Sequence, residues 1–172
     1  MLFIEAWVGG QSTAEHLAAD KPLIEGFART ALHEPTFDLT TEVSRPWARL
    51  WTARGHAGAS PLGFLIAWLV ADELHILSVA VLPEARRRGI ARALMKAALD
   101  FGRASAVRLV LLEVRRSNRP AIKLYRSFSF SAMGVRPNYY ADSGEDAVEM
   151  MVSFDPETGS LLASRDDVRI ED

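Results

Sequence analysis

The chain contains no cysteine, and this absence removes several kinds of chemistry at once. Disulfide bridges and thiolate metal sites are excluded, and so is a covalent acyl-cysteine intermediate. No metal site is expected either, because the four histidines have no shared spacing; they are His16, His33, His56 and His75.

Long apolar runs and a large net charge are also missing. The longest uncharged stretch, residues 57–71, is shorter than the about 20 residues of a membrane-spanning helix and contains Pro61 and Gly63. The chain begins Met-Leu-Phe-Ile-Glu, which places no basic segment ahead of an apolar one, unlike a secretory signal. A formal net charge of −2 provides no overall basic field for nucleic acid. We expect a cytoplasmic protein that binds neither a membrane nor nucleic acid directly.

Length and composition predict one folded domain followed by a tail. A chain of 172 residues with 49% hydrophobic residues is long enough for one sizeable core and too short for two ordinary domains. We expect this domain to span residues 1–154. Residues 155–172 are polar and acid-rich, and we expect them to form a mobile tail.

Hydrophobic periodicity predicts a mixture of strands and helices. Strands are expected over residues 2–8, 47–54, 63–71, 73–82, 107–114, 128–135 and 147–154, with a loop over 139–145. Helices are expected from Ser12 or Thr13 to about residue 32 with an interruption at Pro22, and over residues 38–44, 89–105 and 118–126. The runs 63–71 and 73–82 indicate a tight hairpin, and the helix between 73–82 and 107–114 indicates a parallel pair.

A turn rich in arginine lies where the apolar run 73–82 stops and a periodic helix begins. The first N–H groups of a helix have no partners within the helix, and its dipole favours anions there. Arg86, Arg87 and Arg88 add positive charge, while Gly89 and the small Ala91 let another molecule approach the backbone. The turn therefore suits a phosphorylated ligand, with a solvated basic loop as the alternative. Neither G-x-x-x-x-G-K-[ST] nor a G-x-G-x-x-G after a strand occurs, so the common nucleotide loops are not expected.

The turn and two later segments resemble one enzyme family. R-R-R-G-I-A fits the Q/R-x-x-G-x-G/A signature of the GNAT acetyltransferases. The segments L-E-V-R-R-S-N-R-P-A-I-K-L-Y and R-P-N-Y-Y-A-D-S-G-E-D-A-V-E-M-M are similar to those of the ribosomal-protein-alanine (RimI) type. The resemblance extends from about residue 62 to 154. The first sixty residues match only loosely, since the usual aromatic-Pro-Trp segment is replaced by residues 33–37.

The resemblance implies a GNAT acyl-coenzyme A N-acyltransferase fold with acetyl-coenzyme A as cosubstrate. Such a fold has a mixed, mostly antiparallel sheet of about seven strands with a central parallel pair, flanked by about four helices. In this family the turn holds the pyrophosphate, which maps to Arg86, Arg87, Arg88, Gly89, Ile90, Ala91 and Arg92. The backbone of Val79, Ala80 and Val81 then polarises the acetyl carbonyl, and Asn118 binds the pantetheine arm. Asn118 is also a good helix N-cap, and both roles are compatible.

The resemblance also assigns the two proton-transfer residues. Glu113 becomes the proton acceptor and Tyr125 the proton donor to the thiolate, with Tyr125 also contacting the cofactor. In a strand, Glu113 shares a face with Leu109 and Leu111, which favours the neutral form of the carboxyl group. The alternative for Glu113 is an edge carboxylate paired with Arg115 or Arg116. The alternative for Tyr125 is a tyrosine at the boundary of the core.

The tyrosine pair and a group of arginines complete the candidate residues. The resemblance implies that Tyr139 and Tyr140 wall the acceptor slot, and the alternative is a loop packing on its own hairpin. Five further arginines indicate a solvated basic face rather than a site for ribosomal RNA or an acidic peptide; they are Arg103, Arg108, Arg115, Arg116 and Arg119.

The predicted function is acetyl-coenzyme A-dependent N-acetylation of the α-amine of a protein N-terminus, with a ribosomal protein as a candidate acceptor. Transfer is expected to be direct, in a ternary complex, by a monomer or weak dimer. An α-amine with a pKa near 8 is more easily deprotonated than a lysine near 10.4, which suits a weak carboxylate base. Acetylation of a lysine or small-molecule amine is the alternative. A non-catalytic acyl-coenzyme A-binding module is less favoured because both Glu113 and Tyr125 are present.

Overall fold

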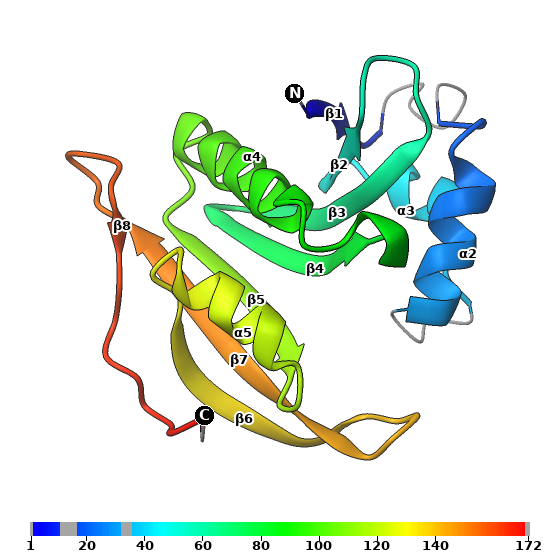
Figure 1. The fold of residues 1–172 in the computed structure, drawn as a ribbon. Coiled ribbons are helices and arrows are strands. Elements are labelled where there is room, and N and C mark those ends of the chain that lie inside the picture. The colour runs from blue at the N-terminus through cyan, green and yellow to red at the C-terminus, as the bar shows by residue number, and fades with distance from the viewer. Residues whose placement is uncertain (1, 11–16, 32–35, 171–172) are drawn as a thin grey trace. The chain divides into compact units, whose positions relative to one another are not determined.

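The computed structural model describes residues 2–10, 17–31 and 36–170 (Figure 1). The chain divides into two compact units, Met1–Val70 with Ile76–Phe101 and Ala71–His75 with Gly102–Asp172. The described residues form eight strands and four α-helices, as expected of a mixed α/β fold. The start of the first predicted helix, at Ser12 or Thr13, lies outside the described residues.

The first unit is built on an antiparallel sheet. Its strands are β1 (Phe3–Val8), β2 (Ala48–Arg54), β3 (Pro61–Val70) and the larger part of β4 (Glu73–Val81). β1 pairs with β2 and β2 with β3, and β4 follows in the strand order. The core of this unit includes Leu17, Ile24, Leu50, Phe64 and Ile66, all at most 2% exposed. The strands predicted over residues 2–8 and 47–54, and the hairpin predicted over residues 63–71 and 73–82, are therefore confirmed to within a few residues.

The helices of the first unit begin where local side chains favour a helix start. They are α2 (Lys21–Ala31), α3 (Leu39–Ser44) and most of α4 (Ile90–Ala104), with a 3-10 turn, η1, over Pro83–Ala85. The side chain of Asp38 accepts a hydrogen bond from the Thr41 amide at 2.6 Å and caps α3. Pro22 is the second residue of α2, so it starts this helix instead of interrupting it as predicted. None of the helices in the described residues has the length and apolar content needed to cross a bilayer.

The second unit is a smaller sheet with one covering helix. Its elements are β5 (Leu109–Arg115), α5 (Arg119–Arg126), β6 (Ser131–Tyr140), β7 (Glu145–Phe154) and the short β8 (Leu161–Leu162). β7 lies between β5 and β6 and is antiparallel to both, and β8 pairs with β7. The Asp72 carbonyl, just before β4, accepts from the Arg108 amide at 2.7 Å. The starts of β4 and β5 therefore lie together, as predicted for a parallel pair joined by a crossover helix.

The boundary of β6 differs from the prediction. Tyr139 and Tyr140 are the last residues of the strand, and the turn covers only residues 141–144. The loop was expected over residues 139–145, but the strand continues to Tyr140, and Pro137 and Asn138 form an irregularity inside it, where the register shifts between Arg136 and Tyr140. Asn138 has a φ of 53° and its amide donates to the Asp146 side chain at 3.0 Å, which lets the strand continue past the irregularity.

Residues 155–170 belong to the second unit and contact its strands and helix at several points. β8 lies in this segment and is the strand beyond the seven predicted. The Asp166 carboxylate accepts from the Ala132 amide at 2.8 Å and pairs with Arg126 at 2.8 Å. The Asp167 amide donates to the Ala132 carbonyl at 2.9 Å. The segment thus adds a short strand and a line of polar contacts, while its mobility stays a prediction.

Candidate active site

The arginine-rich turn lies in the first unit between η1 and α4. Arg86, Arg87, Arg88 and Gly89 are all exposed, whereas Ile90 is 2% exposed and anchors the start of α4 in the core. Arg87 and Gly89 have φ values of 63° and 78°, in the left-handed region. Glycine adopts this region freely, but arginine is strained there by about 1–2 kcal/mol. Backbone strain of this kind is concentrated at ligand-binding turns.

The start of α4 is open to an approaching ligand. A Cβ added at Gly89 would meet nothing within 4 Å, so glycine is required here by its φ and not by crowding. The first hydrogen bond of the helix runs from the Ala93 amide to the Gly89 carbonyl at 3.0 Å, and the helix itself supplies no partners for the amides before it. Arg86 donates from Nε to the Val81 carbonyl at 3.3 Å, which ties the turn to the end of β4. This geometry fits an anionic group such as a pyrophosphate.

The backbone behind the turn depends on a glycine that sequence analysis did not single out. A Cβ at Gly63 of β3 would lie 2.6 Å from the Ala80 carbonyl oxygen. It would also lie 3.2 Å from side-chain atoms of Ile90 and Val81. Gly63 therefore allows β3, the end of β4 and the start of α4 to pack closely. A glycine within an apolar strand was the available signal for such a close approach.

Val79, Ala80 and Val81 lie in β4 as predicted. Ala80 is 5% exposed, while Val79 and Val81 are half-buried. Their side chains therefore belong to the packing of the first unit, and any role in binding falls to their backbone.

Glu113 lies near the end of β5 in the second unit, with 31% of its side chain exposed. It shares the half-buried face of the strand with Leu109 and Leu111, as predicted. Its carboxylate lies 3.5 Å from Arg136 of β6, and Glu113 is the register partner of Glu149 in β7. The alternative interpretation paired Glu113 with Arg115 or Arg116, whereas cross-strand register brings Arg136 to it.

Arg115 and Arg116 contact the turn between β6 and β7. Arg115 donates to both carboxylate oxygens of Asp142 at 2.9 Å and to the Ser143 hydroxyl at 2.8 Å. It also lies 3.5 Å from Glu145. Arg116 lies 3.7 Å from Asp146. β5 therefore holds the turn that follows the tyrosine pair.

Tyr125 is buried in the second unit, with 7% of its surface exposed. It lies on α5 and packs against Phe130, with ring centroids 5.9 Å apart. Burial raises the pKa of Tyr125 above its ordinary value, and the nearby Tyr140 adds to the rise. The phenol is therefore protonated at all ordinary pH values. This residue is part of the core boundary and is also a group able to donate a proton.

Tyr140 connects the other candidates of this unit. Burial raises the pKa of Tyr140 to about 12, against the opposing effect of Arg115, and Glu113 and Tyr139 contribute to the rise. The Arg115 guanidinium lies 3.9 Å from the ring centroid of Tyr140, which meets Tyr139 edge to face at 5.2 Å. Tyr139, Tyr140 and Arg115 are thus in contact, and Glu113 and Tyr125 are linked with Tyr140 only through the electrostatic effects on the pKa values.

Asn118 has the capping role expected of it. Its side-chain oxygen accepts from the Ala121 amide at 3.2 Å and caps α5. The residue is exposed, and its side-chain NH₂ group carries two hydrogen-bond donors that the cap does not use.

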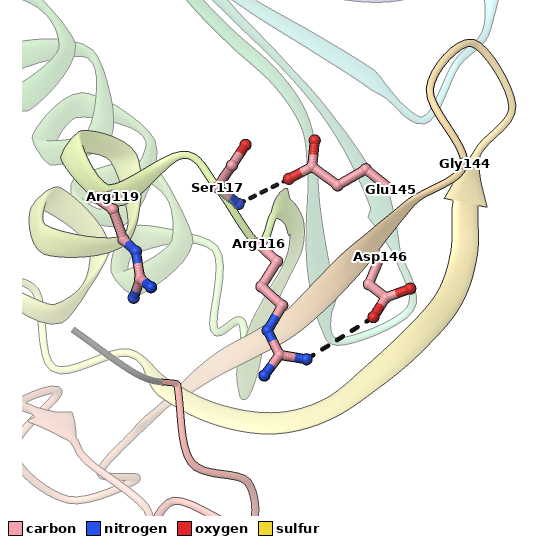
Figure 2. Close-up of a pocket in the computed structure, with 6 residues that line it drawn as sticks. All are labelled: Arg116, Ser117, Arg119, Gly144, Glu145 and Asp146. Carbon is pink, nitrogen blue, oxygen red and sulfur yellow. Dashed lines mark hydrogen bonds and ion pairs between the residues drawn. The ribbon is translucent and has the colours of Figure 1, made fainter.

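A hollow of about 460 Å³ lies beside this cap, between the start of α5 and the β6–β7 turn (Figure 2). Glu145 accepts from the Ser117 amide at 2.7 Å across it, and Arg116 pairs with Asp146 at its other side (Figure 2). Sequence analysis did not predict this hollow, because its walls come from two separate segments. Its lining residues are Arg116, Ser117, Arg119, Gly144, Glu145 and Asp146.

Residues 12–130, more than half of the chain, match the acetyltransferase (GNAT) family. The chain belongs to this family, and the resemblance found in the sequence is confirmed.

The similar proteins include enzymes that act on ribosomal proteins. The chain is 40% identical over 89 residues to the [ribosomal protein bS18]-alanine N-acetyltransferase of Escherichia coli K12, covering 51% of the chain and 60% of the relative. It is 40% identical over 99 residues to N-alpha-acetyltransferase RimI of Mycobacterium tuberculosis H37Rv, covering 58% of each. The chain thus spans about three fifths of the length of these curated relatives.

Solved structures are similar over nearly the whole chain. The ribosomal-protein-S18-alanine N-acetyltransferase from Escherichia coli has a TM-score of 0.69 at 26% identity, covering 98% of this chain and 99% of that one. Arabidopsis thaliana NAA60, in complex with a bisubstrate analogue, has a TM-score of 0.73 at 20% identity, covering 93% and 100%, and supports the fold. The predicted GNAT fold is therefore confirmed.

Proposed function

We propose that this chain is an acetyl-coenzyme A-dependent N-acetyltransferase that acetylates the α-amine of a protein N-terminus. The observation that carries this proposal is that this GNAT family chain holds a partly exposed carboxylate, Glu113, and a buried phenol, Tyr125, in one compact unit. These are the two kinds of group needed to move protons during amide formation.

The first unit supplies the residues that fit the cosubstrate. Acetyl-coenzyme A supplies an activated acetyl thioester when bound. Its pyrophosphate fits the open amides and the charges of the turn, with residues Arg86, Arg87, Arg88, Gly89, Ile90, Ala91 and Arg92 as its holders. The backbone of Val79, Ala80 and Val81 is assigned to the acetyl carbonyl, since a single preorganised N–H donor is worth about 3 kcal/mol in a transition state. Asn118 is assigned to the pantetheine amides.

The two proton transfers are assigned to the second unit. Glu113 accepts the proton of the acceptor ammonium, through water, because its carboxylate is 31% exposed and reaches solvent. Tyr125 gives its proton to the departing thiolate, and its phenolate regains a proton from the second N–H that the attacking nitrogen loses as the amide forms. The raised pKa of Tyr125 keeps the phenol protonated before and after this step. Tyr125 thus acts as the acid while Glu113 acts as the base.

The acceptor is proposed to be an α-amine. A free α-amine has a pKa near 8, and the gap to a lysine near 10.4 corresponds to about 3 kcal/mol of additional deprotonation free energy. Tyr139, 46% exposed, and the half-buried Tyr140 offer aromatic walls for a peptide terminus. The names of the similar proteins make a ribosomal protein N-terminus beginning with alanine the first acceptor to test.

A peptide panel with isotope-labelled acetyl-coenzyme A tests this function. Peptides with a free N-terminal alanine are expected to be acetylated, and the same peptides with a blocked N-terminus and an internal lysine are not. Tyr125→Phe is the matched control for enzyme-dependent transfer. Acetylation of only the blocked lysine peptides or of small amines would reassign the acceptor within the family. Cosubstrate binding without transfer to any amine would exclude the enzyme.

A further inference from the structure

Two glutamates of the second unit lie directly opposite one another and share one arginine. Glu113 of β5 is the register partner of Glu149 of β7, a position where like charges destabilise a sheet. Arg136 of β6 contacts both carboxylates. Its Nε donates to Glu149 at 2.7 Å, while its Nη2 lies 3.5 Å from Glu113. One cation therefore compensates two anions, and it is bound more closely to Glu149.

β6 leaves space for the Glu149 carboxylate. Gly134 of β6 is the register partner of Glu149 on the other side of β7. A Cβ added at Gly134 would lie 2.6 Å from the Glu149 carboxylate oxygen. Glycine thus leaves the space that the carboxylate occupies, and the ring of Tyr139, 5.7 Å from Arg136, limits where the guanidinium can move.

We propose that Glu149 is a positioning residue for the base, because it holds Arg136 in the shorter ion pair and leaves the Glu113 carboxylate able to accept a proton. This inference rests on the proposed function of Glu113. A guanidinium bound closely to Glu113 would stabilise the carboxylate and weaken it as a base. Glu149 prevents this by competing for the same cation.

The pKa of Arg136 agrees with this geometry. It is raised first by the hydrogen bond to Glu149, then by the charge of Glu149, and only then by the charge of Glu113. The other ionisable neighbours are engaged elsewhere. Arg115 is bound to Asp142 and Glu145, and the ionisable residues of β4, Glu73 and His75, lie 2.8 Å from one another. Tyr140 of β6 and, beyond it, Tyr125 of α5 are neutral at ordinary pH because their pKa values are raised.

Two substitutions with opposite expected effects test the inference. Glu149→Gln removes one anion and frees Arg136 for Glu113, so the acid limb of the kcat/KM–pH profile is expected at lower pH. Arg136→Gln leaves two opposed carboxylates without their cation, so this limb is expected at higher pH. A partly exposed ion pair contributes about 0.2–1 kcal/mol, which corresponds to a shift of the acid limb by roughly 0.2–0.7 pH units in each direction. One acceptor peptide is used throughout, so that the titration of its own amine is common to all profiles.

Matched controls separate this role from a structural one. Glu157→Gln and Arg108→Gln make the same changes of charge at exposed positions, and their profiles are expected to match the parent. Gly134→Ala displaces the Glu149 carboxylate by crowding, and it is expected to shift the limb in the direction of Glu149→Gln. If Glu149→Gln fails to fold, Gly134→Ala tests the same loss of the Glu149–Arg136 contact.

The outcomes distinguish the positioning role of Glu149 from the proposed role of Glu113 as the base. Opposite shifts in the two variants support the positioning role. Profiles that keep the parent's acid limb in both variants overturn it, provided that Glu113→Gln is inactive. If Glu113→Gln retains full activity, the assignment of the base itself is wrong and the positioning role is overturned with it.

Discussion

Replacing Gly63 with alanine tests whether close strand packing sets the shape of the proposed pyrophosphate site. The added methyl group would lie 2.6 Å from the Ala80 carbonyl oxygen, which is backbone and cannot move alone. It would also press at 3.2 Å on Val81, at the end of β4, and on Ile90, at the start of α4. The two elements that border the turn must therefore shift.

The size of this effect follows from the contacts. Overpacking a core costs about 1–3 kcal/mol, which for a chain of this length lowers the melting temperature by roughly 2–12 °C. Because the displaced residues include the anchor of the helix start, the dissociation constant of acetyl-coenzyme A is expected to rise several-fold. Thermal unfolding and calorimetric titration measure the two effects.

A second glycine provides the matched control. A Cβ at Gly26 in α2 would meet nothing within 4 Å, so Gly26→Ala is expected to stabilise the protein by about 1 kcal/mol through helix propensity and to leave cosubstrate affinity unchanged. A Gly63→Ala protein that melts with the parent and binds acetyl-coenzyme A equally well would refute the role assigned to Gly63.

Three further predictions concern the second unit. Tyr125→Phe is expected to lower kcat by about 100-fold or more with little change in cosubstrate affinity, as measured by steady-state kinetics and titration; equal kcat would remove the acid role. Because the pKa of Tyr125 is raised in the folded state, its contribution to stability is complete below pH of about 10 and is lost as pH rises further. Denaturation curves at alkaline pH should therefore decline less steeply for Tyr125→Phe than for the parent, and equal slopes would contradict this. Arg115→Gln releases the turn from Asp142 and Glu145, so the KM for the peptide is expected to rise several-fold with a smaller change in kcat, and an unchanged KM would argue against a role of the turn in acceptor binding.

The features that depend on local chemistry follow from the sequence. Asp38 and Asn118 cap the helices expected after them, and the buried strands follow their apolar runs to within a few residues. Helix caps and strand periodicity are determined by residues close together in the chain. The same holds for the Arg/Gly turn, where Gly89 has the positive φ expected of a glycine at a tight turn.

Features that depend on pairing between distant segments were missed. The partner of Glu113 is Arg136 and not Arg115, because the register of β5, β7 and β6 decides which charges meet. The residues Pro137 and Asn138 have turn chemistry, but pairing with β7 extends the strand beyond them. No pattern within one segment contains this information.

The contacts of Ala132 have a consequence for solubility. β6 is the outermost strand of its unit, and an outer strand with free backbone groups invites pairing with another molecule. Asp166 and Asp167 satisfy the amide and the carbonyl of Ala132, so the final segment shields this margin from other copies. A chain shortened to residue 154 would lose that shield and should self-associate at concentrations where the full chain does not.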